Sequence, residues 1–237
     1  MWDAAAQYAR VKGLIESTSR QAGRDLNEIT IVLVAKNQPT EKIAQVIQAG
    51  AMDLAQNYPE RMETLFEHLP DAKALNWHMI GHCQSRKAAL VVKYFKSMHS
   101  LDSLELAERI ARIAHTEGKV LPVMLEINLS GEMTKKGFRV TDEADYQQLL
   151  IIVDAIRRFP GLELAGLMTM PPFSNDPEIS RPVFKKLKGL QQMINKDMGD
   201  ERIRWLSMGT SQDYLVAIEE GSTHVRLGTC VFGERKL

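Results

Sequence analysis

Ile29-Thr-Ile-Val-Leu-Val-Ala35 is an apolar, β-branched run near the start of the chain. A strand that is buried on both faces has this pattern, because none of its positions has to be polar. Pro39 follows at a favoured first position of a helix, and Gly50 ends that helix. The segment therefore predicts a buried strand followed by a helix, which is the repeating unit of a parallel sheet.

The same unit recurs along the whole chain. About eight predicted strands, each separated from the next by a helix, match a (β/α)8 barrel, which typically takes about 250 residues. A doubly wound open sheet usually has only about five or six strands, and the chain contains no Gly-x-Gly-x-x-Gly or P-loop sequence. We therefore predict an α/β fold, a single (β/α)8 TIM barrel domain over residues 1–237 with an extra N-terminal helix. The strands are expected at 29–35, 51–55, 77–80, 97–101, 120–129, 162–168, 203–208 and 224–227, and the helices at 1–22, 39–50, 59–69, 84–95, 103–117, 142–159, 177–196 and 212–220.

Composition excludes several classes of protein. Thirty basic and thirty acidic residues give a net charge of zero, which argues against binding nucleic acid through phosphate neutralisation. The apolar runs at 31–35 and 149–153 are far shorter than the roughly 18–20 residues that cross a bilayer, and residues 1–20 are no signal peptide. Cys83 and Cys230 form neither a disulfide scaffold nor a zinc motif. We expect a cytoplasmic protein without nucleic-acid or membrane partners, and a monomer because no long apolar face stands out.

Lys36 ends the apolar strand at 29–35. A barrel places such a residue at the mouth formed by the carboxyl ends of its strands, where active sites lie. Hydrocarbon behind the amine disfavours its charged form, and a neutral amine is what condensation with an aldehyde requires. The alternative is a strand-end lysine that simply reaches solvent.

Two consecutive strand ends predict a phosphate site. Ser211 follows the strand at 203–208, and Gly228 and Thr229 follow the strand at 224–227. Phosphate binds to bare backbone N–H groups and hydroxyls, and barrels commonly build such sites after strands seven and eight. The alternative is a pair of turns that only cap helices. Strand ends also carry three methionines, Met168, Met170 and Met208. Either they line a pocket for the ring of a ligand, or they fill the core.

Histidine spacing argues against a metal site. His78 and His82 are four residues apart in an extended segment, which separates them by roughly 13 Å. The other four histidines, at 68, 99, 115 and 224, show no pairing in the sequence. We therefore expect no metal.

A lysine, a phosphate site and a barrel together suit two kinds of ligand. One is a sugar phosphate in a class I aldolase, and the other is pyridoxal 5′-phosphate (PLP), which carries both an aldehyde and a phosphate. Arg226 lies two residues before Gly228 and in register to face the same pocket. A guanidinium that donates to a pyridine nitrogen keeps this nitrogen unprotonated and weakens the ring as an electron sink.

Short motifs along nearly the whole length identify a family. In these motifs the chain resembles the pyridoxal phosphate homeostasis proteins, a PLP-binding family similar to the N-terminal barrel of bacterial alanine racemase. The motifs are Val34-Ala-Lys36 with Pro39; Asn57-Tyr58; Trp77-His-Met-Ile-Gly81 with Gln84 and Lys87; Ser100-Leu-Asp102; Ile127-Asn-Leu-Ser130 with Lys135 and Gly137; Gly166-Leu-Met168; Leu206-Ser-Met-Gly209 with Ser211 and Asp213; and Gly221-Ser-Thr-x-Val-Arg-Leu-Gly-Thr229 with Phe232-Gly233.

The resemblance implies a role for each matching residue. It implies a protein of intracellular PLP homeostasis that stores, shields or delivers the cofactor, with apo PLP enzymes as recipients and without established turnover. No catalytic residue is implied. The implied cofactor-binding residues are Lys36, which forms a Schiff base with PLP; Ser211, Gly228 and Thr229, which hold the phosphate; Arg226, which meets the pyridine nitrogen; and Asn57, His78 and Met208, which line the pocket.

One alternative within the resemblance is a PLP-dependent amino-acid racemase of fold type III. Racemases of this type take a second acid/base tyrosine from an additional β-domain, and the chain ends at Leu237 without one. Racemisation needs an acid/base group on each face of the substrate. Departures from the family motifs at Ala55-Gln56, Arg86 and Gln212 remove carboxylates and add a cation, which predicts a more positive rim.

Overall fold

Strands of the predicted kind close into a barrel in the computed structural model, which describes residues 2–132 and 136–234. Lys135 and Leu237 lie outside this part of the chain. Within the described residues, eight parallel strands form the closed ring, because the first strand pairs with the last and the fourth pairs with the fifth. In cyclic order they are β1 (Thr30–Val34), β2 (Asp53–Gln56), β3 (Asn76–Met79), β4 (Ser97–Leu101), β5 (Leu121–Asn128), β7 (Leu162–Met168), β8 (Trp205–Ser207) and β9 (His224–Leu227).

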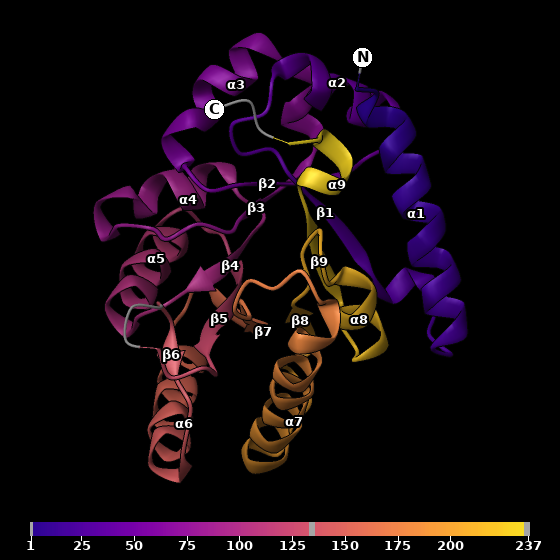
Figure 1. The fold of residues 1–237 in the computed structure, drawn as a ribbon. Coiled ribbons are helices and arrows are strands. Elements are labelled where there is room, and N and C mark those ends of the chain that lie inside the picture. Colours follow the sequence, from indigo (N-terminus) through magenta and orange to yellow (C-terminus); the bar gives the residue numbers. More distant parts are fainter. Residues whose placement is uncertain (1, 133–135, 235–237) are drawn as a thin grey trace.

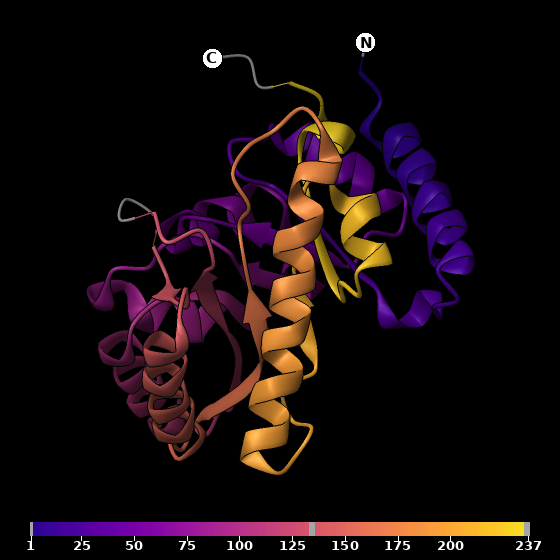
Figure 2. The same ribbon diagram turned by 60° about the horizontal axis from the view of Figure 1, so that its bottom comes forward.

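Helices surround this ring, and the extra helix α1 precedes the first strand (Figures 1 and 2). The predicted (β/α)8 TIM barrel is thereby confirmed. Helix α1 contacts α2, α8 and α9 on one side of the molecule. None of the helices in residues 2–132 and 136–234 is long and apolar enough to span a membrane. The helices are α1 (Ala4–Gln21), α2 (Thr40–Gln48), α3 (Met62–His68), α4 (Ala88–Tyr94), α5 (Leu104–Thr116), α6 (Glu143–Arg157), α7 (Arg181–Met198), α8 (Tyr214–Glu219) and α9 (Thr229–Phe232).

Local signals in the sequence set some of these boundaries. The side chain of Ser103 caps α5 by accepting a hydrogen bond from the backbone N–H of Leu106. Gly199 ends α7 in the left-handed conformation, with φ of 70°. Among the described α-helices and strands, two short elements were not predicted: α9, and the two-residue strand β6 (Phe138–Arg139), which pairs with β5. Both are too short to produce a hydrophobic period.

Candidate functional site

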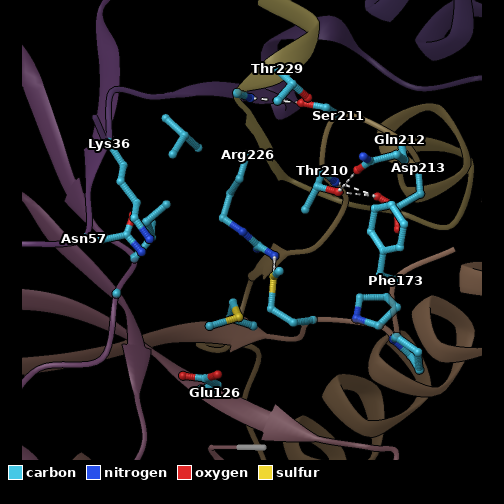
Figure 3. Close-up of a pocket in the computed structure, with 18 of the residues that line it drawn as sticks. Lys36, Asn57, Glu126, Phe173, Thr210, Ser211, Gln212, Asp213, Arg226 and Thr229 are labelled. Carbon is cyan, nitrogen blue, oxygen red and sulfur yellow. Dashed lines mark hydrogen bonds between the residues drawn. The ribbon is translucent and has the colours of Figure 1, made fainter. Parts of the chain in front are cut away.

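A cavity of about 700 Å³ opens at the mouth formed by the carboxyl ends of the barrel strands (Figure 3). Residues that follow β1, β2, β8 and β9 line it together with Glu126 from β5 and Met168 from β7. This is the end at which TIM barrels carry their active sites. Six of the eight predicted site residues line the cavity, namely Lys36, Asn57, Ser211, Arg226, Gly228 and Thr229.

Lys36 stands in a tight turn directly after β1 and is half-buried. The next residue, Asn37, has φ of 58°, a left-handed conformation that asparagine tolerates better than most residues. The Lys36 Nζ lies 5.3 Å from the ring centre of Tyr58, which holds the amine by a cation–π contact. The turn and this ring direct the amine into the cavity beside Asn57 (Figure 3).

Asn57 carries an orphaned acceptor. Among the described residues its Oδ1 is the one buried side-chain oxygen or nitrogen without a hydrogen-bond partner. Gly81 allows this position, because a Cβ there would lie 2.5 Å from the Asn57 backbone oxygen. A buried unpaired acceptor is costly, so the site favours a ligand that donates a hydrogen bond at this point.

The predicted phosphate residues come together although they belong to different loops. Ser211 Oγ accepts hydrogen bonds from the backbone N–H groups of Gly228, at 3.1 Å, and Cys230, at 3.3 Å. The turn before Ser211 requires Gly209, which has φ of 93° and whose Cβ would lie 2.5 Å from that of Ala217. The cluster offers backbone N–H groups and hydroxyls, which suit an anion.

Arg226 is a buried cation at the cavity wall, with 4% of its surface exposed. Its Nη1 donates to Ser207 Oγ at 2.5 Å, and its Nη2 donates to the Thr169 carbonyl oxygen and to Met170 Sδ. Burial lowers the pKa of Arg226 to about 10, while the charges of Asp213 and Glu126 oppose this shift. No ion pair to Arg226 occurs in the part of the chain that the structure describes.

His78 and Met208 do not line the cavity, contrary to the expectation. Met208 is fully buried in the core beside β8. His78 lies inside the barrel, where its ring contacts those of His99 and His224 at centroid distances of 5.1 and 6.3 Å. The contact between these rings has no signal in the spacing of the histidines, because barrel closure brings together strands that are distant in sequence. None of the described residues forms a cluster of three or more groups that could hold a metal ion.

The cavity residues that were not predicted as site residues include His82 and Glu126. His82 Nδ1 lies 2.7 Å from Asp102 Oδ2, and His82 lines the cavity. Glu126 also lines it, and burial is the main cause that raises the pKa of this carboxyl group. Glu126 was detectable as a charged residue within an otherwise apolar strand. Of the departures from the family motifs, Gln212 lines the cavity, whereas Arg86 is exposed outside its lining.

The buried histidines predict acid sensitivity. Burial lowers the pKa of His224 to about 3, so below pH 6.5 the unfolded chain binds a proton that the folded chain does not bind. The stability that depends on neutral His224 is complete above pH 6.5 and is lost as the pH falls towards 3. Between pH 7 and 4.5, we expect His224 alone to cost roughly 2 to 3 kcal/mol of unfolding free energy.

Urea denaturation of the wild type and a His224→Phe variant at both pH values measures this cost. Between pH 7 and 4.5, the free energy of unfolding of the variant should fall by roughly 2 to 3 kcal/mol less than that of the wild type. The reason is that phenylalanine fills the site but cannot bind a proton. An equal loss in the two chains would contradict the assignment.

A closed barrel with an amine and an anion-binding cluster at its mouth defines a TIM-barrel protein with a small-molecule site at the carboxyl ends of its strands. The family description "Alanine racemase, N-terminal domain" matches residues 19–236. The chain belongs to this family and, within it, to the pyridoxal phosphate homeostasis proteins. The resemblance stated from the motifs is confirmed.

Relatives and a solved structure support this assignment over nearly the full length. The pyridoxal phosphate homeostasis protein of Vibrio cholerae is 36% identical over 225 residues, which are 93% of this chain and 92% of that protein. The one from Aquifex aeolicus is 34% identical over 99% of both chains. PipY of Synechococcus elongatus, solved with PLP bound, superposes with a TM-score of 0.78 at 27% identity, covering 93% of this chain and 100% of PipY.

Proposed function

We propose that this protein binds PLP and acts in intracellular PLP homeostasis, holding the cofactor through a Schiff base between its aldehyde and the Lys36 amine. The observation that carries the proposal is the buried Arg226 guanidinium, which lines the same cavity as Lys36 and Ser211 but has no ion-pair partner among the described residues. An unpaired buried charge is costly, and an anionic ligand in the cavity offsets that cost. The PLP-bound state of PipY supports the identity of the ligand.

The residues present fit this cofactor. PLP supplies an aldehyde that condenses with amines, a phosphate and a pyridine nitrogen. The Ser211 and Thr229 hydroxyls are placed to hold the phosphate beside Gly228, whose N–H donates to Ser211 Oγ, and the orphaned Asn57 Oδ1 would accept a hydrogen bond from a ligand donor. Arg226 donates to the pyridine nitrogen and keeps it unprotonated. Since this weakens the ring as an electron sink, the site favours holding the cofactor over turnover.

Three further properties belong to the same proposal. Residues 1–237 act as one domain, the protein works in the cytoplasm as a monomer, and apo PLP enzymes receive the cofactor from it. The size of the cavity is consistent with delivery of a small cofactor. Its volume of about 700 Å³ lies within the range of roughly 300–1,000 Å³ for small-molecule sites, and an amine of a recipient protein would enter through its mouth.

Reductive trapping on the wild-type protein tests the function. PLP is added to the purified chain, the absorbance spectrum is recorded, borohydride is added, and the proteolytic peptides are mapped by mass spectrometry. We expect a visible absorbance band before reduction and one modified peptide, which contains Lys36. A protein that stays colourless, or a label spread over exposed lysines, would overturn the proposal.

A second candidate, an amino-acid racemase, is favoured by the acid/base groups at the mouth, Glu126 and the His82–Asp102 pair. Incubation with L-alanine or L-serine and PLP, followed by chiral analysis, separates the two functions. A D-isomer that forms above the background of free PLP would favour the racemase.

A further inference from the structure

A line of polar side chains crosses the interior of the barrel beneath the cavity. Its members come from β2, β3, β4, β8 and β9, so the line runs across the ring rather than along one strand. His99 and Ser207 are completely buried, whereas the carboxylate at the far end is one-quarter exposed. In order, the side chains are Arg226, Ser207, His99, Ser97, His78 and Asp53.

The direction of the first hydrogen bonds follows from the chemistry of arginine. A guanidinium can only donate, so Ser207 Oγ accepts from Arg226. His99 Nδ1, at 2.9 Å, is the one acceptor that the described hydrogen bonds give the buried Ser207 hydroxyl, so we assign the Ser207 proton to this bond and Nδ1 accepts it. The proton of a neutral His99 therefore resides on Nε2. Burial, more than the neighbouring charges of His78, His224 and Arg226, lowers the pKa of His99 far below its ordinary value and keeps the ring neutral.

The remaining bonds continue in the same direction. His99 Nε2 lies 3.2 Å from both Ser97 Oγ and His78 Nδ1, and these two atoms lie 2.7 Å apart. Because the Asp53 carboxylate can only accept, His78 Nε2 must donate to it; in a neutral ring Nδ1 then accepts, from Ser97 or from His99, and the proton of His78 resides on Nε2. This nitrogen lies 3.0 Å from Asp53 Oδ1. A carboxylate can only accept, so the line ends there.

We propose that these side chains form a one-way hydrogen-bond chain that orients Arg226 for its ligand, with Ser207 and His99 as positioning residues. Arg226 has five N–H groups. The hydrogen bond to Ser207 uses one N–H of Nη1, and those to Thr169 and Met170 use the two of Nη2, which leaves two N–H groups for a ligand acceptor. Arg226 is thereby set to recognise an aromatic nitrogen that accepts a hydrogen bond. The ligand part of this inference rests on the proposed function.

The chain also gives the guanidinium a remote counter-charge. Each donor in a hydrogen-bond chain polarises the next, so the Asp53 carboxylate increases the negative character of Ser207 Oγ. This stabilises Arg226 in place of a direct ion pair. Glu126 and Asp213 line the same cavity, but neither forms an ion pair with Arg226 in the described part of the chain, so its remaining N–H groups stay available to a ligand.

NMR of the histidine rings tests the direction of the hydrogen-bond chain without any ligand. The protein is labelled with 15N-histidine, and long-range proton–nitrogen correlations are recorded at pH 7.5, with His78→Phe and His99→Phe variants to assign the signals. We expect both His78 and His99 as neutral rings with the proton on Nε2. A proton on Nδ1 of either ring, or an imidazolium at either position, would overturn the direction of the chain.

Ligand discrimination tests the positioning role. The probes are PLP and its analogue with C–H in place of the ring nitrogen. The wild type should bind PLP about tenfold more tightly than the analogue, which is the effect of roughly one charge-assisted hydrogen bond. Ser207→Ala and His99→Phe should lose this preference, and Ser207→Ala serves alone if the larger change prevents folding.

His224→Phe is the matched control for packing. The His224 ring lies 5.4 Å from that of His99, but its Nδ1 bonds to Thr223 Oγ1 outside the chain. This variant should keep the tenfold preference. If Ser207→Ala keeps it too, the positioning role is wrong. If the wild type binds neither probe, the proposed function fails, while the NMR result still decides whether the chain exists.

Discussion

A Lys36→Ala variant is expected to give no borohydride-stable adduct with PLP and to bind the cofactor at least about a hundredfold more weakly than the wild type. Lys36 is the amine placed by the turn after β1 and by the Tyr58 ring at the cavity that also contains the anion-binding cluster. Removal of the amine removes the covalent bond but leaves Ser211 and Arg226 in place. Weak, non-covalent binding should therefore remain, which equilibrium dialysis or fluorescence titration measures.

Lys136 provides the control, because it is a second amine that lines the same cavity. A Lys136→Ala variant should still give the Lys36 adduct after reduction. An adduct that persists in Lys36→Ala but disappears in Lys136→Ala would show that Lys136, and not Lys36, forms the covalent bond. Mass mapping of the reduced peptides distinguishes these results directly.

Gly166→Ala is expected to lower the free energy of unfolding by about 3 kcal/mol or more. Gly166 lies in β7 in register with Trp205 of β8. A Cβ at this position would lie 2.2 Å from the Trp205 carbonyl oxygen and 2.6 Å from its Cβ. Neither strand can move away without breaking barrel hydrogen bonds, so the strain cannot be relieved cheaply.

Gly189→Ala is the matched control. Gly189 lies in the middle of α7, and a Cβ there would meet no atom within 4 Å. Alanine should raise stability by about 0.5–1 kcal/mol at this position, because glycine is a poor helix former. Chemical denaturation followed by circular dichroism measures both variants. Equal stability of the two would contradict the close approach of β7 and β8.

Most of the barrel could be predicted because its signals are local. The strands at 97–101, 162–168 and 224–227 have the boundaries predicted from the sequence, and Ser103 and Gly199 mark helix ends. The last segment was harder. Thr229–Phe232 consists of β-branched and apolar residues that are typical of strands, yet the structure has a short helix there.

The site could be predicted where a residue ends a strand. Lys36, Arg226 and Gly228 were expected at the mouth from their place in the sequence, and the structure brings them to one cavity. His78 was expected there as well, but its side chain lies in the interior below the cavity. A motif shows that a residue belongs to the site region, but it does not show at which depth of the barrel the side chain lies.

The sequence by itself determined the alternation of strands and helices, the strand ends that carry the lysine and the anion-binding turns, and the family. Only the tertiary structure decided which side chains meet inside the ring. His78, His99 and His224 are spread over nearly 150 residues of sequence, and their contact depends on the closure and register of the barrel. The period of two along a strand determines which positions face inward, whereas the register between neighbouring strands determines which inward side chains lie at the same height.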